Sequence, residues 1–260
     1  MVVRRILGIG SLWLLLATCA FAAKPLTICV EEAPQRPWTM PDVSGLAIDL
    51  LGLVQQQLGE EFGYVVRPWR RCLEELKLGA VDAVVGGAAT PERQRYARFP
   101  LRADGEPDSA QAMYTDRFDV YLRAGSGAAW DGRTLTLGAR PTVLTQRGYA
   151  VVEQLRQQGY TVADIATTAS DALRHLAAGV HDVAIVQASE AGYVYRKNSQ
   201  LHSAVARAGT PYFEAPMYLM VSTAAYERDA GRIDALWREI ANSRQTRAFR
   251  QLERTARANH

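Results

Sequence analysis

Short apolar runs alternate with helix-forming segments through the first half of the chain. Runs of the kind that form buried strands occupy residues 26–30, 64–66 and 81–85. Apolar residues recur at helical spacing over 46–58, and residues 72–78 also predict a helix. Strand and helix in alternation predict a parallel sheet covered by helices.

The second half of the chain repeats this plan. Strands are expected at residues 142–145, 162–165 and 183–186. Helices are expected between them, at 149–158 and 170–178. The chain is therefore predicted to contain two α/β units of similar design.

Residues 76–85 and 176–185 show the repeat most clearly. In each, a helix ends at a glycine and an aspartate precedes a buried strand. Two similar α/β lobes predict a ligand cleft between them. We expect residues 23–104 and 212–260 to form the first lobe and residues 105–211 to form the second.

The middle and the end of the chain depart from the repeat. Residues 117–123 and 218–221 are strand-like, and residues 228 to 256 predict one long terminal helix. We expect the chain to cross between the lobes near residues 101–114 and 210–218. These two crossings would act as the hinge.

The first 22 residues have the pattern of a secretory signal. Arg4 and Arg5 precede an apolar stretch at 6–17, and Ala20 and Ala22 then offer small residues at the two positions that a signal peptidase inspects. The apolar stretch is shorter than the roughly 20 residues that span a bilayer. We therefore expect cleavage and release into the periplasm, with lipid anchoring at Cys19 as the alternative.

Composition and charge narrow the function classes. The net charge of +3 comes from interspersed residues, which gives no support for nucleic-acid binding. The four histidines are scattered, and neither CxxC nor HExxH occurs, so we predict no metal site and no cofactor. Cys29 and Cys72 remain after the signal is removed, either as one disulfide or as two buried thiols.

An ordered set of short motifs supports a more specific interpretation. It contains Pro37-Trp38, Ser44 to Leu50, Gly79 to Asp82, Thr90-Pro91-Glu92-Arg93, Phe99-Pro100 and Ala178 to Asp182. This set resembles the type 2 periplasmic solute-binding proteins, in the polar amino-acid (family 3) branch. The resemblance implies a two-lobed α/β fold in which each lobe is a mixed sheet flanked by helices. It also implies a monomer that captures a small polar solute and delivers it to an inner-membrane ABC permease.

The resemblance assigns ligand contacts in the first lobe. Arg93 matches the arginine that grips a ligand carboxylate, with a surface ion pair as the alternative role. Trp69 matches an aromatic residue that stacks on the ligand, with core packing as the alternative. Glu32 matches an acidic position at the end of the first strand, with a solvated loop carboxylate as the alternative. Trp38 matches an aromatic residue of the core or of the cleft mouth.

In the second lobe, Gly148 and Tyr149 lie where the family uses the turn before a helix to bind the ligand carboxylate. Two positions depart from the family pattern. Gly87 or Ala88 replaces a serine, and Gln187 replaces the aspartate that pairs with the ligand's amino group. A neutral amide is a poorer partner for an ammonium group. A carboxylate or another polar solute is therefore an alternative to an α-amino acid.

Two other functions are compatible with the same fold. One is a periplasmic enzyme similar to the cyclohexadienyl dehydratases, which would need a buried acid or base in the cleft, with Glu32 or Glu190 as candidates. The other is a sensor protein that presents its ligand to a membrane receptor. We expect a binding protein rather than an enzyme.

Overall fold

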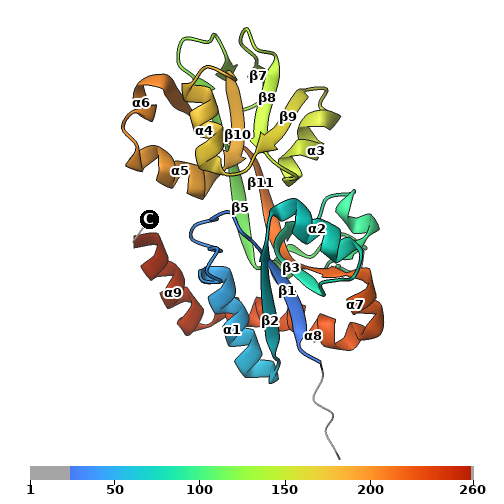
Figure 1. Cartoon of the computed structure of the whole chain (residues 1–260). Helices are drawn as coiled ribbons and strands as arrows, with labels where there is room; N and C mark the ends of the chain where they lie inside the picture. Colours follow the sequence, from blue (N-terminus) through green and yellow to red (C-terminus); the bar gives the residue numbers. More distant parts are fainter. Residues whose placement is uncertain (1–23, 259–260) are drawn as a thin grey trace, which may run out of the picture.

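The computed structural model describes residues 24–258 (Figure 1). The predicted signal segment and Cys19 lie outside the described residues. In the described part, no helix has both the length and the apolar character needed to cross a membrane.

One mixed sheet of nine strands runs through the described chain. Its strands follow the order β2-β1-β3-β11-β5-β10-β8-β9, and β4 pairs with β11. Their bounds are β1 Leu26–Glu31, β2 Phe62–Arg67, β3 Ala83–Ala88, β4 Ala97–Arg98, β5 Tyr114–Arg123, β8 Thr142–Gln146, β9 Thr161–Ala166, β10 Val183–Gln187 and β11 Val205–Ser222. A separate pair, β6 Ala129–Trp130 and β7 Leu135–Thr136, lies outside this sheet.

Strands β5 and β11 connect the two halves of the sheet. The C-terminal part of β11 pairs with β3, and residues Val205 to Met217 of β11 pair with β5. Strand β5 in turn pairs with β10. The parallel strands β1, β2 and β3 therefore belong to one lobe, and β8, β9 and β10 belong to the other (Figure 1). The two-lobed α/β fold predicted from the sequence is confirmed.

Helices cover the two halves of the sheet separately (Figure 1). The first lobe carries α1 Leu46–Leu58, α2 Trp69–Lys77, α7 Thr223–Arg228, α8 Ala230–Gln245 and α9 Arg247–Ala258, with the 3-10 turns η1 Arg93–Arg95 and η2 Ser109–Gln111. The second lobe carries α3 Ala150–Gln157, α4 Ala169–Ala177, α5 Ala188–Lys197 and α6 Leu201–Ala204.

The single terminal helix expected over 228–256 is wrong, because Thr246 divides it. Thr246 has an extended backbone, with φ −68° and ψ 152°. Its hydroxyl accepts a hydrogen bond from the backbone N–H of Phe249, which starts α9 as an N-cap does. The break lets Phe249 point into the core, where it is 1% exposed.

A disulfide joins Cys29 in β1 to Cys72 in α2, which confirms the bonded alternative. The two Cα atoms are 5.6 Å apart, within the usual range for a bridge, and both residues are fully buried. The bond fixes the start of α2 beside the end of β1. Trp69 and Glu31, each a few residues from a cysteine, are thereby held close to each other.

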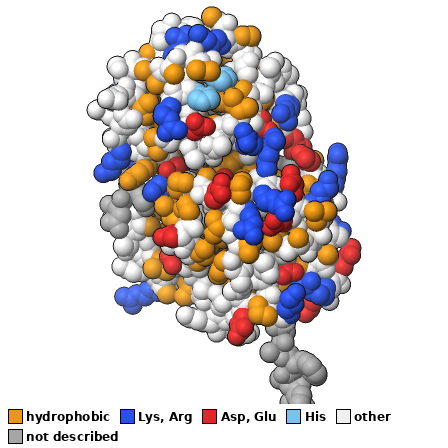
Figure 2. Space-filling model, in the orientation of Figure 1, with side chains coloured by type: hydrophobic (Ala, Val, Ile, Leu, Met, Phe, Trp, Pro, Cys, Tyr) orange, Lys and Arg blue, Asp and Glu red, His pale blue; other side chains and the backbone are white. Residues whose placement is uncertain are grey.

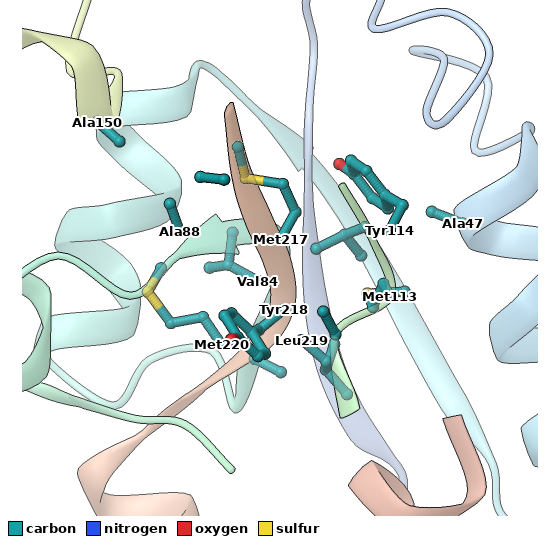
Figure 3. Packing of buried hydrophobic residues seen from close by; sticks show 14 of the residues in the cluster. Ala47, Val84, Ala88, Met113, Tyr114, Ala150, Met217, Tyr218, Leu219 and Met220 are labelled. Atoms are coloured by element: carbon teal, nitrogen blue, oxygen red, sulfur yellow. The ribbon is translucent and has the colours of Figure 1, made fainter. Parts of the chain in front are cut away.

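Buried apolar side chains form one cluster that includes residues of both lobes. Figure 3 shows part of it, with Ala88 and Met217 of the first lobe near Ala150 of the second. All three side chains are at most 7% exposed. The two lobes are thus in contact through close-packed apolar groups as well as polar ones.

Candidate functional site

A small cavity of about 30 Å³ lies between the lobes. It is located where β1, β3 and the crossing strands β5 and β11 face the N-terminus of α3. It is lined by Glu31, Gln35, Thr39, Trp69, Val85, Gly86, Ala88, Arg93, Tyr114, Asp116, Phe118, Tyr149, Ala150 and Met217. Charged, aromatic and small apolar groups therefore converge on one space.

Glu31, the last residue of β1, places its carboxyl in this cavity. The Tyr149 hydroxyl donates to its two oxygens at 3.0 and 2.9 Å, and Gln35 Nε2 donates to Oε2 at 2.6 Å. Gln35 also donates to the Tyr149 hydroxyl. Burial raises the pKa of Glu31 to about 8, and these hydrogen bonds offset only part of that effect. Glu31 is therefore mostly protonated at neutral pH.

Asp116 is a second buried acid, supplied by β5. Burial raises its pKa to about 7, although its carboxylate accepts hydrogen bonds from the Arg117 backbone N–H at 2.8 Å and from Gln187 Nε2 at 3.1 Å. Its strand alternates buried and exposed residues, which directs Tyr114, Asp116 and Phe118 to the same side. The cavity thus contains two carboxyl groups whose charge depends on what lies beside them.

Arg93 is the cation of the cavity and is only 5% exposed. Its guanidinium donates to the carbonyl oxygens of Ala88 at 3.2 Å and Gly148 at 3.1 Å, and it lies 5.2 Å from the Trp69 ring. Burial lowers its pKa, but an arginine stays protonated in proteins. No carboxylate of the described residues lies within 4 Å of it, so the surface ion pair considered above is not formed.

Aromatic rings form most of the remaining wall. Tyr149 meets Trp69 at 72° and Phe118 at 89°, both edge to face, with ring centroids 6.2 and 6.1 Å apart. Tyr114 stands opposite Gly86, whose φ is 78°. A Cβ at Gly86 would overlap the Tyr114 hydroxyl, so glycine is required there both by space and by backbone conformation.

Four predicted site residues line the cavity: Arg93, Trp69, Ala88 and Tyr149. Gly148 lies beside it, and its carbonyl oxygen accepts from Trp69 Nε1 at 2.9 Å as well as from Arg93. The structure therefore brings together predicted residues from both lobes.

Two predicted positions are off by one residue. Glu32 is exposed and does not line the cavity, whereas Glu31 does. Gly87 faces away from it, because a Cβ there would lie 2.9 Å from the Cβ of Met220, whereas Gly86 lines the cavity. Neighbouring strand residues point to opposite faces, so a shift of one position moves a residue out of the site.

Trp38 and Gln187 support the cavity wall instead of lining it. The Trp38 ring stacks on Tyr114 at 4.1 Å between ring centroids. Gln187 is fully buried, and its side chain accepts from the backbone N–H of Glu190 at 2.7 Å while it donates to Asp116. It therefore caps α5 and orients the acid that does line the cavity.

Sequence reasoning missed Glu31, Asp116, Gln35 and Phe118. The alternation along strand β5 could have identified Asp116 and Phe118, since Tyr114 and these two residues alternate with polar ones. Gln35 lies in an irregular loop, where no periodicity predicts its direction.

Two ion pairs connect the lobes outside the cavity. Arg36 Nη1 contacts both carboxylate oxygens of Glu190 in α5, at 2.7 and 2.8 Å. On the other side, Arg70 of α2 pairs with Asp164 of β9. Asp164 also accepts from the backbone N–H of Gly148 at 2.8 Å.

On the face shown in Figure 2, positive and negative side chains are interspersed, as the sequence predicted.

Two wider grooves adjoin the cavity. The charged groove, about 740 Å³, lies between α2 and α3 and is lined by residues that include Arg70, Glu74, Lys77, Arg95, Glu153 and Asp164. The apolar groove, about 360 Å³, is lined by residues that include Ala89, Pro91, Pro107, Phe213, Pro216 and Tyr218. In the described part of the chain, no three histidine, cysteine or acidic side chains are grouped to hold a metal ion.

The two lobes and the buried polar cavity between them define a solute-binding protein. Residues 26–208 match the bacterial extracellular solute-binding proteins, family 3, and the chain belongs to this family. The resemblance drawn from the motifs is confirmed. No curated protein matches the sequence.

Several solved structures share the fold. The GluR0 ligand-binding core from Nostoc punctiforme in complex with (L)-glutamate has a TM-score of 0.67 and 17% identity, over 88% of this chain and 97% of that one. A histidine kinase sensor domain with similarity to periplasmic binding proteins has a TM-score of 0.69 and 18% identity, over 90% and 96%. An ancestral arginine-binding protein bound to glutamine has a TM-score of 0.65 and 15% identity, over 89% and 96%. At these identities the likeness shows the fold alone.

Proposed function

We propose that the cavity between the lobes binds a small solute by its carboxylate, which Arg93 holds. The observation that carries this proposal is a buried guanidinium that faces the cavity with carbonyl oxygens and a ring as its partners, but no carboxylate. A carboxylate would be a stronger partner than either carbonyl. Glu31 and Asp116 would face a cationic or hydrogen-bond-donating group of the solute, so an amino acid fits, as does another polar carboxylate.

Capture would follow from the arrangement of the lobes. Strands β5 and β11 are the connections about which the lobes would open and close. The Tyr149 hydroxyl crosses from the second lobe to Glu31 in the first, and Gly148 crosses to Arg93 and Trp69. A solute that takes over these partners would bind best to the closed form and would hold it closed.

The protein would act as a monomer in the periplasm, after loss of residues 1–22, and would deliver its solute to an inner-membrane ABC permease. The predicted boundary at 104/105 would move to the start of β5, since η2 lies against α8 of the first lobe. The boundary near 211/212 stays part of this proposal. The likeness to a sensor domain supports a second possibility for the partner, in which the protein presents its ligand to a membrane receptor. A permease gene beside this one would favour import, and a receptor gene would favour sensing.

Thermal unfolding in the presence of amino acids, amines and carboxylates tests the proposal. A bound solute should raise the melting temperature. Arg93→Gln should weaken the binding of a carboxylate solute at least about 30-fold, because loss of one partner of a buried charge pair costs about 2 kcal/mol or more. Arg95→Gln is the matched control, since Arg95 is exposed in the same turn. If the two variants lose the same affinity for the solute, or if neither loses any, Arg93 does not bind the solute.

A second candidate function is a dehydratase-like reaction, favoured by Glu31. A carboxyl that is protonated near neutral pH and enclosed with an arginine can serve as a general acid. Incubation with prephenate or arogenate tests this candidate. Product formation that Glu31→Gln abolishes would establish the enzyme, and binding without product would leave a binding protein.

A further inference from the structure

We infer that the solute of this cavity carries an apolar tail, which leaves between Ala88 and Ala150 and lies in the apolar groove. This inference rests on the proposed binding function and names the class of solute. The solute would have a polar, carboxylate-bearing head in the cavity and a flexible hydrocarbon chain outside it.

Two alanines separate the cavity from the apolar groove. Ala88 ends β3 in the first lobe and Ala150 starts α3 in the second. Both line the cavity and both line the apolar groove. Figure 3 shows the two methyl groups near each other on the same side of Met217. The two residues that border both spaces therefore have the smallest side chains that a non-glycine residue can offer.

The opposite path, toward the charged groove, is closed by hydrogen bonds. The Gly148 carbonyl oxygen accepts from Trp69 Nε1 at 2.9 Å and from Arg93 Nη2 at 3.1 Å. A tail leaving on that side would break two bonds between the lobes and would leave a buried guanidinium with fewer partners, which is costly. A tail between Ala88 and Ala150 displaces only apolar contacts.

The volumes of the cavity and of the apolar groove agree with a solute whose head and tail occupy different spaces. A single water needs about 10–15 Å³ of such space. The cavity of about 30 Å³ therefore encloses only a few non-hydrogen atoms when the lobes are in contact. The adjoining apolar groove, with about 360 Å³, has room for a chain of several methylene groups.

The wall of the apolar groove suits hydrocarbon. Pro91, Pro107, Phe213 and Pro216 offer rings without charge, and the polar side chains of Glu153 and Gln157 lie along the same groove. Ala89 lines this groove without lining the cavity, and it is half-buried. The groove is open to solvent on one side, so a tail placed there would bury the side that faces these apolar groups, which is favourable.

A homologous series of straight-chain α-amino acids tests the inference. Alanine, norvaline, norleucine and 2-aminooctanoate share one head and differ only in tail length. Their dissociation constants are measured by calorimetry with the intact protein. We expect each added methylene to tighten binding by up to about fourfold, the ratio that complete burial of one CH₂ group gives. Flat or weakening affinity beyond alanine would overturn the inference while leaving the proposed function in place.

Variants of the passage and of the groove locate the tail. Ala150→Leu should abolish the gain with length, because the larger side chain fills the passage; the ratio of the alanine and norleucine dissociation constants, measured in the same variant, reports this gain whatever the change in head binding. Ala89→Asp, at a half-buried site outside the cavity, should reduce only the binding of the longer members, since a charge is placed beside the hydrocarbon. Retention of the full gain in Ala89→Asp would overturn the placement in the apolar groove.

Lysine provides the opposing case. It has norleucine's four-carbon side chain with an ammonium group added at the end, which the charged groove would favour. We expect norleucine to bind at least tenfold more tightly than lysine. Tighter binding of lysine would place the exit on the side of Gly148 and would contradict the inference. If no member of the series binds, alanine included, the proposed amino-acid head fails and the inference fails with it.

Discussion

The hydroxyl of Tyr149, at the start of α3 in the second lobe, donates a hydrogen bond to the carboxyl of Glu31, at the end of β1 in the first. The two oxygens of Glu31 lie 3.0 and 2.9 Å from this hydroxyl. One buried contact therefore links the lobes through a titratable group. The charge of Glu31 and the closure of the cleft are coupled through it.

Stability should fall as the pH rises, because of Glu31 and Asp116. The pKa of Glu31 rises from 4.5 to about 8 on burial, and that of Asp116 rises from 3.8 to about 7. The folded chain thus holds protons that the unfolded chain has released, so the stabilisation present below the unfolded pKa is lost as the pH rises through the folded one. Melting temperatures from pH 4.5 to 8 should show this decline.

Glu31→Gln should flatten part of that decline, because the amide does not titrate. Glu32→Gln is the control, since Glu32 is the exposed residue that follows the end of β1. Glu32→Gln should follow the unaltered protein. A Glu31→Gln protein with the full original slope would show that Glu31 does not hold a proton in the folded state.

Loss of the Arg36–Glu190 ion pair should favour opening of the cleft. Glu190 is 4% exposed, and its carboxylate receives two contacts from Arg36. Arg36→Gln should weaken solute binding roughly tenfold, because a hydrogen bond to a charged group contributes about 1.5 kcal/mol or more to the closed form. Small-angle scattering should show a larger radius of gyration.

The control for that variant is Arg71→Gln. Arg71 pairs with Glu75 one turn along the same helix, at 2.7 Å, and connects no lobes. Such an exposed pair contributes only about 0.3–0.5 kcal/mol. Equal effects of the two substitutions on affinity would argue against Arg36 as an interlobe contact.

The disulfide should contribute strongly to stability. Cys29 and Cys72 are 43 residues apart in sequence, so the bond constrains a long loop of the unfolded chain. Cys29→Ala/Cys72→Ala should lose about 2–4 kcal/mol in urea unfolding. Addition of reductant should destabilise the unaltered protein and leave the double variant unchanged. A double variant as stable as the parent would refute this role.

Gly86→Ala should destabilise the first lobe by about 1–3 kcal/mol. The added methyl would overlap the Tyr114 hydroxyl, and φ of 78° disfavours any side chain. Gly63→Ala is the matched control in strand β2, where a Cβ meets nothing within 4 Å. It should be neutral or slightly stabilising, since alanine loses less freedom on folding. Denaturant midpoints of the two variants measure the difference.

The sequence predicted the architecture because hydrophobic periodicity and the repeated helix–Gly–Asp–strand design are local signals. It placed Arg93, Trp69 and Tyr149 in the site through motifs. It named Glu32 and the pair Gly87 or Ala88, whereas Glu31, Gly86 and Ala88 line the cavity, because apolar runs in a fully buried strand carry no alternation that sets which face each residue takes. Strand β1 is buried at five of its six positions, so the sequence does not indicate which of its residues face the cavity.

Other features depend on contacts between distant parts of the chain. Arg36 and Glu190 are 154 residues apart, and Gln187 meets Asp116 across 71 residues. No local pattern pairs such residues. The break at Thr246 was hidden for a different reason: threonine is tolerated inside helices, and only its capping bond to Phe249 shows that one helix ends there.

A crystal structure of the protein with a solute found in the thermal screen tests the central claim most directly. We predict that the solute lies between the lobes, with its carboxylate oxygens within about 3 Å of the Arg93 guanidinium. The Gly148 carbonyl should then have lost or shared its bond to Arg93. A solute bound elsewhere, with Arg93 still donating to both Ala88 and Gly148, would contradict the account.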